Sequence, residues 1–173
     1  MILGKDFFER PAYEVAPLLI GKILCRRKGG DIKRVRITET ECYYGFDDTA
    51  SHAHKGMTER NSVMFDEGGK TYIYLCYGIH NMLNITTGKA DHPEAVLIRG
   101  VEGAQGPGRV TKHLDIGREL NKTPVCDPHG EIWFEDDGYV PNITTSKRIG
   151  IDYAEQKDRD IPWRFLDSKI AKA

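Results

Sequence analysis

Two glutamates within residues 37–45, ITETECYYG, have the type and spacing that acid–base catalysis needs. As a β-strand, this segment would direct alternate side chains to opposite faces of a sheet. One face would then carry Val35 and Ile37, followed by Glu39 and Glu41. A carboxylate at the edge of a hydrophobic core is desolvated, and its pKa rises toward the range in which a general base works. The alternative is a pair of structural carboxylates at a solvated strand end.

The two glutamates are expected to differ in role. Glu41 is followed on the same face by Tyr43, which would form a flat aromatic wall beside it. Glu39 lies closer to the hydrophobic end, so we expect it to be deeper or bound to the backbone, with a structural role. Arg99 lies in a second apolar segment, EAVLIRGVE, where an arginine is costly unless it pairs with a carboxylate. We therefore expect Arg99 to pair with Glu41, either in a catalytic site or in a purely structural ion pair.

A pair of histidines, His52 and His54, follows two aspartates in DDTASHAH and could ligate a metal ion. This spacing matches none of the strong metal-binding motifs. The four cysteines, at positions 25, 42, 76 and 126, are scattered and form no C-x-x-C motif. We therefore expect no metal and no cofactor, with one histidine acting as a hydrogen-bond donor in a pocket. A metal-dependent hydrolase built on His52 and His54 is the alternative.

The segment YIYLCYG contains three tyrosines, Tyr72, Tyr74 and Tyr77, just before Gly78. We expect Tyr72 to lie in the core. Tyr77 differs because it would sit at the tip of a hairpin, where an aromatic ring is exposed. An exposed ring at a tip is suited to stacking on bases or to insertion between them.

These candidates fall mainly on predicted strands and loops. Helical spacing covers residues 12–20, with Gly21 as the expected end. The predicted strands cover residues 22–27, 33–44, 94–102 and one or two short segments within 146–167, with a hairpin over residues 71–87 that reverses near Gly78. Residues 47–70 are predicted to form a long loop, and residues 106–120 a turn leading into a helix. The predicted fold is therefore α+β with a mainly antiparallel sheet, in one domain over residues 1–173.

The composition is that of a globular protein with 39% hydrophobic residues and a formal net charge of −1. No run of about 18 apolar residues predicts a membrane span, and the charged N-terminus is unlike a signal peptide. Nucleic-acid-binding domains are often strongly basic, so any contact with DNA would need local positive charge. The candidates for contact with the DNA backbone are Arg109, Lys112, Lys147 and Arg148.

Taken in order, several motifs resemble one enzyme family. They are ETECYYG, SHAH with TERNSVMF, YIYLCYGIHNMLNI, AVLIR, RIGI and PWRF, and they extend from near Phe7 to Phe165. This set resembles the alkyladenine (3-methylpurine) DNA glycosylases. The resemblance implies an enzyme that flips damaged purines out of double-stranded DNA and hydrolyses the N-glycosidic bond, leaving an abasic site. It also implies a metal-free monomer with a curved antiparallel sheet like that of the C-terminal domain of formyltransferases.

The resemblance further implies a role for each matching residue. Glu41 matches the general base that activates the attacking water, and Arg99 and the backbone carbonyl of Ile149 match groups that hold this water. The walls of the base pocket match Tyr43, His52, Tyr74 and Asn84, of which Asn84 disfavours bases with a guanine-type amino group. Tyr77 matches the wedge that fills the space left by the flipped base.

Two other classes remain open from the residues themselves. One is the metal-dependent hydrolase described above, and the other is a non-catalytic nucleic-acid-binding domain that uses Tyr77 and the basic residues. A DNA repair enzyme would act in the cytoplasm, at the nucleoid, of a prokaryote or in the nucleus of a eukaryote.

Overall fold

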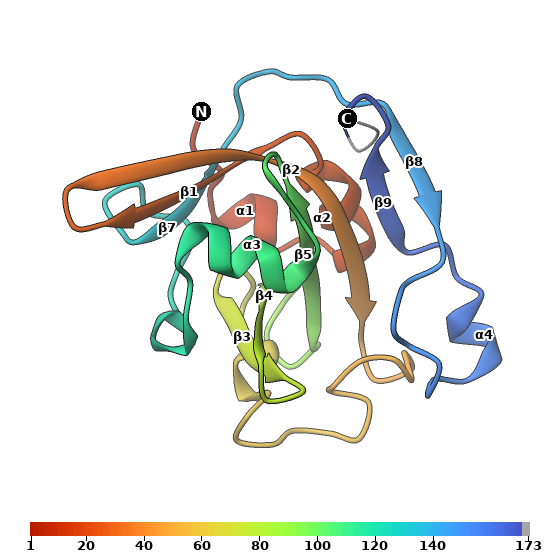
Figure 1. Ribbon diagram of the computed structural model, residues 1–173. Coiled ribbons are helices and arrows are strands. Elements are labelled where there is room, and N and C mark those ends of the chain that lie inside the picture. Colours follow the sequence, from red (N-terminus) through yellow and green to blue (C-terminus); the bar gives the residue numbers. More distant parts are fainter. Residues whose placement is uncertain (171–173) are drawn as a thin grey trace.

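A curved antiparallel β-sheet is the main element of the structure (Figure 1). The computed structural model describes residues 1–170, and its strands are β1 (Ile23–Lys28), β2 (Asp31–Tyr44), β3 (Thr71–Cys76), β4 (His80–Thr87), β5 (Glu94–Val101), β6 (Ala104–Gln105), β7 (Ile132–Glu135), β8 (Ile143–Ser146) and β9 (Arg164–Asp167). The main path runs in the order β3-β4-β5-β2-β1-β7, while β6 pairs with β5 and β9 joins β2 to β8. The predicted α+β class with an antiparallel sheet is confirmed, and the likeness to formyltransferases stays a prediction.

Several short helices accompany this sheet. They are α1 (Lys5–Phe8), α2 (Ala12–Leu19), α3 (Pro107–Leu114) and α4 (Gln156–Arg159), with the 3-10 helices η1 (Ser62–Phe65) and η2 (Arg118–Leu120). Helix α2 buries Ala12, Val15, Ala16 and Leu19, the spacing of one apolar helix face. Side chains of α2 and α3 enter the same hydrophobic core as those of β2 and β5, so the sheet curves around both helices. No helix within residues 1–170 has the length and apolar character needed to cross a membrane.

An irregular register between β2 and β5 decides which side chains face the site. Ile37 pairs with Val101, but Thr40 pairs with Ile98, and register shifts occur on both sides of Glu39. Ile37 and Cys42 lie in the same core cluster although they are five residues apart, which strict alternation forbids. The bulge therefore reverses the faces of β2.

The prediction that the glutamates continue the face of Ile37 is consequently wrong. Beyond the bulge, Thr40 and Cys42 point into the core, where the Thr40 hydroxyl donates to the Ala16 carbonyl at 2.8 Å. Glu41 therefore points to the opposite face. The same irregularity separates Arg99 from Val101, which lies in the core, although regular alternation along β5 would put both on one face.

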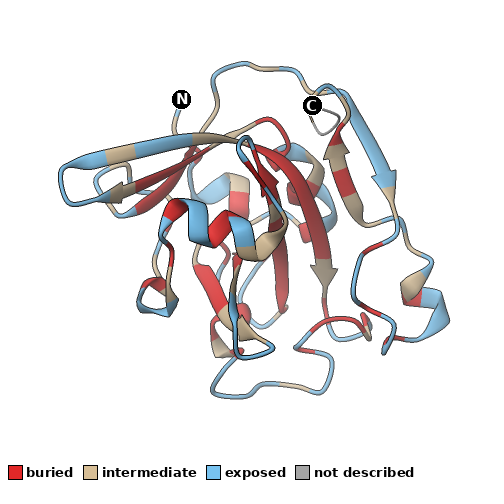
Figure 2. Cartoon of the chain, viewed as in Figure 1, coloured by how far each residue is buried: buried red, intermediate tan, exposed pale blue. Residues whose placement is uncertain are grey.

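Most of the predicted elements are present, including α2 within one residue of its expected end and the β3–β4 hairpin with its reversal at Gly78 (φ +66°). The short strands β7 and β8 were not predicted. Of the one or two short strands expected within residues 146–167, β9 is present, whereas residues 147–153 form irregular structure with bends and turns. The long loop over residues 47–70 is present and contains η1. It packs its own small cluster of buried side chains against β3 and β5, which Figure 2 shows as buried segments within an otherwise exposed loop.

Candidate active site

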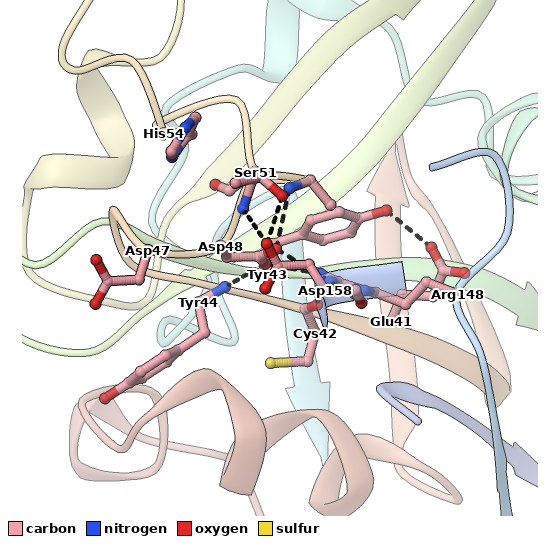
Figure 3. Close-up of polar contacts among 12 residues, drawn as sticks. Glu41, Cys42, Tyr43, Tyr44, Asp47, Asp48, Ser51, His54, Arg148 and Asp158 are labelled. Atoms are coloured by element: carbon pink, nitrogen blue, oxygen red, sulfur yellow. Dashed lines mark hydrogen bonds and ion pairs between the residues drawn. The ribbon is translucent and has the colours of Figure 1, made fainter. Parts of the chain in front are cut away.

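Glu41 lies at the centre of the candidate site and has no exposed side-chain surface, 0%. Its Oε1 accepts a hydrogen bond from the Tyr43 hydroxyl at 2.9 Å (Figure 3), and its Oε2 accepts one from the backbone N–H of Ile149 at 2.7 Å. Nε of Arg99 lies 3.7 Å from Oε2. Burial raises the pKa of Glu41, while Arg99 and the two hydrogen bonds oppose this rise. The site therefore holds a desolvated carboxylate that keeps three partners for its charged form.

Glu39 is held more tightly by positive charge than Glu41. Its Oε1 accepts hydrogen bonds from Nε of Arg99 at 3.1 Å and from Nε of Arg164 at 2.5 Å. Glu39 keeps slight solvent exposure, whereas Glu41 keeps none. The expectation that Glu39 is the deeper glutamate is therefore wrong, but its expected structural role agrees with these two ion pairs. Arg99 contacts both carboxylates and links them.

An aromatic pocket opens beside Glu41, on the same side of β2. It is lined by Tyr43, Ala50, Ser51, His52, Met64, Tyr72, Tyr74, Asn84, Ala95 and Tyr153. All four residues expected to form a base pocket thus line one cavity, although they come from β2, the long loop, β3 and β4. The side chains offer flat aromatic surfaces together with a few hydrogen-bonding groups, as in small-molecule sites.

His52 is uncharged in this pocket at neutral pH. Burial, with a smaller contribution from the charge of Arg60, lowers the pKa of His52 to about 4. Its Nδ1 lies 2.9 Å from the hydroxyl oxygen of Tyr72, and its ring centroid lies 4.4 Å from that of Tyr74. Asn84 is buried beside them and donates from Nδ2 to the carbonyl of Tyr72 at 3.2 Å. The pocket therefore presents neutral hydrogen-bonding groups between aromatic rings.

The other histidine is placed apart from this arrangement. His54 is exposed, and its Nδ1 lies 2.6 Å from the carbonyl oxygen of Phe46. Within residues 1–170, no group of three or more His, Cys, Asp or Glu side chains is arranged to hold a metal ion. His52 and His54 therefore do not act together in this structure, and the metal-dependent hydrolase has no geometric support in the part of the chain described.

Tyr77 occupies the tip of the β3–β4 hairpin, as the sequence predicts. It is 91% exposed and has a left-handed backbone with φ of +51°, next to Gly78. The neighbouring Ile79 is also exposed. The tip therefore carries two apolar side chains into solvent, a position from which a side chain can reach a nucleic acid.

The four predicted DNA-backbone residues divide into two groups. Arg109 and Lys112 are exposed and line a groove at α3, and Lys147 is exposed beside Asp160, with 2.8 Å between Nζ and Oδ1. Arg148 is buried and pairs with Asp48, so it cannot reach a phosphate in this structure. The prediction for Arg148 is wrong because the basic SKR motif does not show which of its side chains turns inward.

Known proteins resemble this chain over most of its length. Residues 6–170 match the family described as methylpurine-DNA glycosylase. The chain belongs to the methylpurine-DNA glycosylase family. Three proteins named "Putative 3-methyladenine DNA glycosylase" are similar to it. The protein from Methanocella arvoryzae is 43% identical, and the match covers 96% of this chain and 92% of that protein. The protein from Psychrobacter cryohalolentis is 42% identical, and the match covers 88% of this chain and 86% of that protein. The protein from Clostridium botulinum is 37% identical, and the match covers 95% of each chain.

Two residues of the pocket were not among those expected from the sequence. Tyr72 lies in a core cluster, as expected, but it also lines the pocket and contacts His52. It shares a strand face with Tyr74, and this two-residue spacing could have placed it in the pocket. Tyr153 lines the mouth of the pocket and donates from its hydroxyl to the carbonyl of Ala50 at 2.6 Å. No local signal marks Tyr153, because a long-range contact places it there.

Proposed function

We propose that this protein excises damaged purines from double-stranded DNA by hydrolysing the N-glycosidic bond with a water molecule activated by Glu41. The observation that carries the proposal is the fully buried Glu41 carboxylate beside an aromatic pocket, held by Tyr43, Ile149 and Arg99. Membership of the methylpurine-DNA glycosylase family supports the same reaction class. The product would be an abasic site.

The charge of Glu41 suits this chemistry in two ways. Cleavage of a glycosidic bond passes through an oxocarbenium-like state with positive charge on the sugar. An anionic carboxylate stabilises this charge and also accepts a proton from the attacking water. Arg99 and the N–H of Ile149 favour the ionised form of Glu41 despite its burial, because both lower its pKa. The backbone carbonyl of Ile149 would help to hold the water.

The pocket suits an alkylated purine. Alkylation at N3 or N7 makes the base cationic, which weakens the glycosidic bond and favours stacking against the rings of Tyr43 and Tyr74. Neutral His52 adds hydrogen bonding without repelling the cation. Asn84 would disfavour bases that carry a guanine-type amino group. The proposed substrates are 3-methyladenine, hypoxanthine and ethenoadenine, together with 7-methylguanine, whose amino group would make it the least favoured of the four.

Base flipping completes the proposal. Removing a base from the stack costs a few kcal/mol and costs least for damaged or mismatched bases, which adds selectivity. Tyr77 would fill the vacated space in the duplex, and Arg109, Lys112 and Lys147 would contact phosphates.

The test is incubation of the purified protein with duplex oligonucleotides that contain hypoxanthine, ethenoadenine or a 3-methyladenine analogue. Strand cleavage in alkali after the reaction reveals abasic sites. We expect cleavage at the lesion by the wild type and none above background by Glu41→Gln. The absence of abasic sites with all three lesions, while the protein binds lesion DNA, would instead favour a non-catalytic binding domain.

A further inference from the structure

A buried ion pair between Asp48 and Arg148 lies beside the candidate active site and has no part in the reaction described above (Figure 3). The Arg148 side chain is 0% exposed and the Asp48 side chain 1%. Nη1 and Nη2 of Arg148 donate to the two carboxylate oxygens of Asp48 at 2.7 and 3.0 Å, and Nη2 also donates to the carbonyl of Asp158 at 3.1 Å. Such bidentate pairs fix direction as well as distance.

Arg148 connects this pair to the groups that hold the catalytic glutamate. Its Nη1 donates to the carbonyl of Cys42 at 2.9 Å, which anchors the segment after β8 against β2. The next residue, Ile149, donates its backbone N–H to Glu41. The guanidinium carbon of Arg148 also lies 5.1 Å from the ring centroid of Tyr43, the second donor to Glu41. Both neutral donors to Glu41 are therefore in contact with Arg148 or bonded directly to it in the chain.

Asp48 connects the pair to the pocket. Its carboxylate accepts backbone hydrogen bonds from Tyr44 and from Ala50, both at 3.1 Å. Ala50 lines the pocket, and His52 follows two residues later. The carboxylate of Asp48 therefore holds the beginning of the loop that carries the pocket's histidine, against the end of the strand that carries Glu41.

We propose that Arg148 and Asp48 are positioning residues, which hold the Ile149 N–H and the Tyr43 ring in place against Glu41. Arg148 thus organises the site from within and does not bind the DNA backbone. Lysine would not replace it, because the arrangement uses two nitrogens of a planar fork and a flat surface against an aromatic ring. The catalytic consequence rests on the proposed function, whereas the effect on Glu41 itself does not.

A purely structural ion pair would stabilise the fold without changing the pKa of Glu41, so the test must measure the titration of the Glu41 carboxyl group directly. The charged and titratable groups that influence Glu41 are Arg99 from β5, Tyr43 from its own strand, and Arg148 and Tyr153 from the segment after β8. The positive charge of Arg148 and the N–H of Ile149 both lower the pKa of Glu41. Loss of the Arg148 charge should therefore raise the pKa of Glu41.

The experiment uses three variants, Arg148→Met, Arg148→Lys and Asp48→Asn, in the full-length protein. The control is Arg36→Met. Arg36 also makes a bidentate pair, with Asp137 at 3.0 and 2.8 Å, and its guanidinium carbon lies 4.3 Å from the ring centroid of Tyr139. This pair shares no residue with the site. Two quantities are measured below the melting temperature of each variant. They are the single-turnover rate on hypoxanthine DNA with saturating protein, and the titration of the Glu41 carboxyl carbon by NMR without DNA.

We expect Arg148→Met and Asp48→Asn to lower the single-turnover rate by up to about 100-fold, the loss that misplacing a reacting group by about 1 Å can cause. Arg148→Met should also raise the titration midpoint of Glu41. Arg148→Lys should lower the rate but leave the midpoint near that of the wild type, because it keeps the charge and loses the fork. Arg36→Met should change neither quantity.

The proposal is overturned if the Arg148 and Asp48 variants melt earlier but keep the wild-type rate and midpoint, since the pair would then be structural only. If Arg148→Met does not fold, wild-type rates in Arg148→Lys and Asp48→Asn overturn it equally well. If the wild type itself forms no abasic sites, the proposed function fails. The titration then still decides whether Arg148 acts on Glu41.

Discussion

The exchange of Glu41 for glutamine separates the chemistry of the site from its stability. Glutamine keeps the shape of the side chain and can still accept the hydrogen bond from Ile149, but it cannot take a proton from water. A general base typically contributes about 10²–10⁴ in rate. At about 1.36 kcal/mol for each factor of ten, this is about 2.7–5.4 kcal/mol of barrier. The single-turnover rate of Glu41→Gln should therefore fall by about 10²–10⁴-fold, while its affinity for lesion DNA stays nearly unchanged.

Glu41→Gln should lower the rate but raise the stability of the folded protein at neutral pH. Burial raises the pKa of Glu41 in the folded protein above its ordinary value of 4.5. The folded state therefore binds this proton more tightly than the unfolded state, so the contribution of Glu41 to stability is largest at low pH and is lost as pH rises through the folded pKa. Glutamine carries no such penalty. The melting temperature of Glu41→Gln relative to the wild type should rise between pH 4 and pH 7.

Glu39→Gln is the matched variant, with the opposite expected effects. It removes the charge that Arg99 and Arg164 share, so it should lower the free energy of unfolding by about 1–3 kcal/mol. Its single-turnover rate should remain measurable. Both variants are compared by single-turnover cleavage with excess protein and by thermal melting across pH. A stable but inactive Glu39→Gln beside an active Glu41→Gln would show that the two roles are reversed.

Four further predictions address the DNA-contacting surface and the pocket. Tyr77→Ala should weaken binding to lesion DNA by about 1–3 kcal/mol, the usual contribution of one aromatic stack, and unchanged binding would remove Tyr77 from the interface. A plot of the logarithm of the DNA association constant against the logarithm of the salt concentration should have a slope near −2.7, about −0.9 for each of Arg109, Lys112 and Lys147. A slope of zero would argue against DNA as the partner. Cleavage should survive EDTA, whereas loss that zinc or magnesium restores would contradict the proposed mechanism. The His52 ring should titrate near pH 4 by NMR, and a midpoint near 6.5 would contradict its burial. Its neutral form therefore contributes to the free energy of unfolding above pH 6.5, and this contribution is lost as pH falls from 6.5 through 4.

The sequence pattern predicted the structure most reliably where a residue's environment is set by its neighbours in the chain. Tyr77 is exposed because Gly78 turns the hairpin immediately after it, and a left-handed backbone at this turn directs the ring outward. Helix α2 begins and ends within one residue of its expected limits because its apolar spacing and Gly21 are local signals. The antiparallel sheet followed from hairpins, which form between adjacent segments.

Residue identity also predicted which side chains meet at the site more reliably than the strand face on which they lie. Glu41, Arg99 and Tyr43 do meet, because a buried arginine and a buried carboxylate stabilise each other and a tyrosine two residues away shares their face. The face itself was predicted wrongly. Alternation along β2 is broken by a bulge, and the bulge is produced by pairing with β5, about 60 residues further along the chain.

The sequence alone therefore determined the class of fold, the hairpin tip that carries Tyr77 and the residue types that meet at the candidate site. Only the tertiary structure decided that Glu41 is deeper than Glu39, that Tyr72 and Tyr153 line the pocket, and that Arg148 turns inward to Asp48. The physical reason is the range of the interactions. Turns and helix ends depend on a few adjacent residues, whereas the burial of a charge depends on partners that folding brings together from distant segments, here Asp48 and Arg148 across 100 residues.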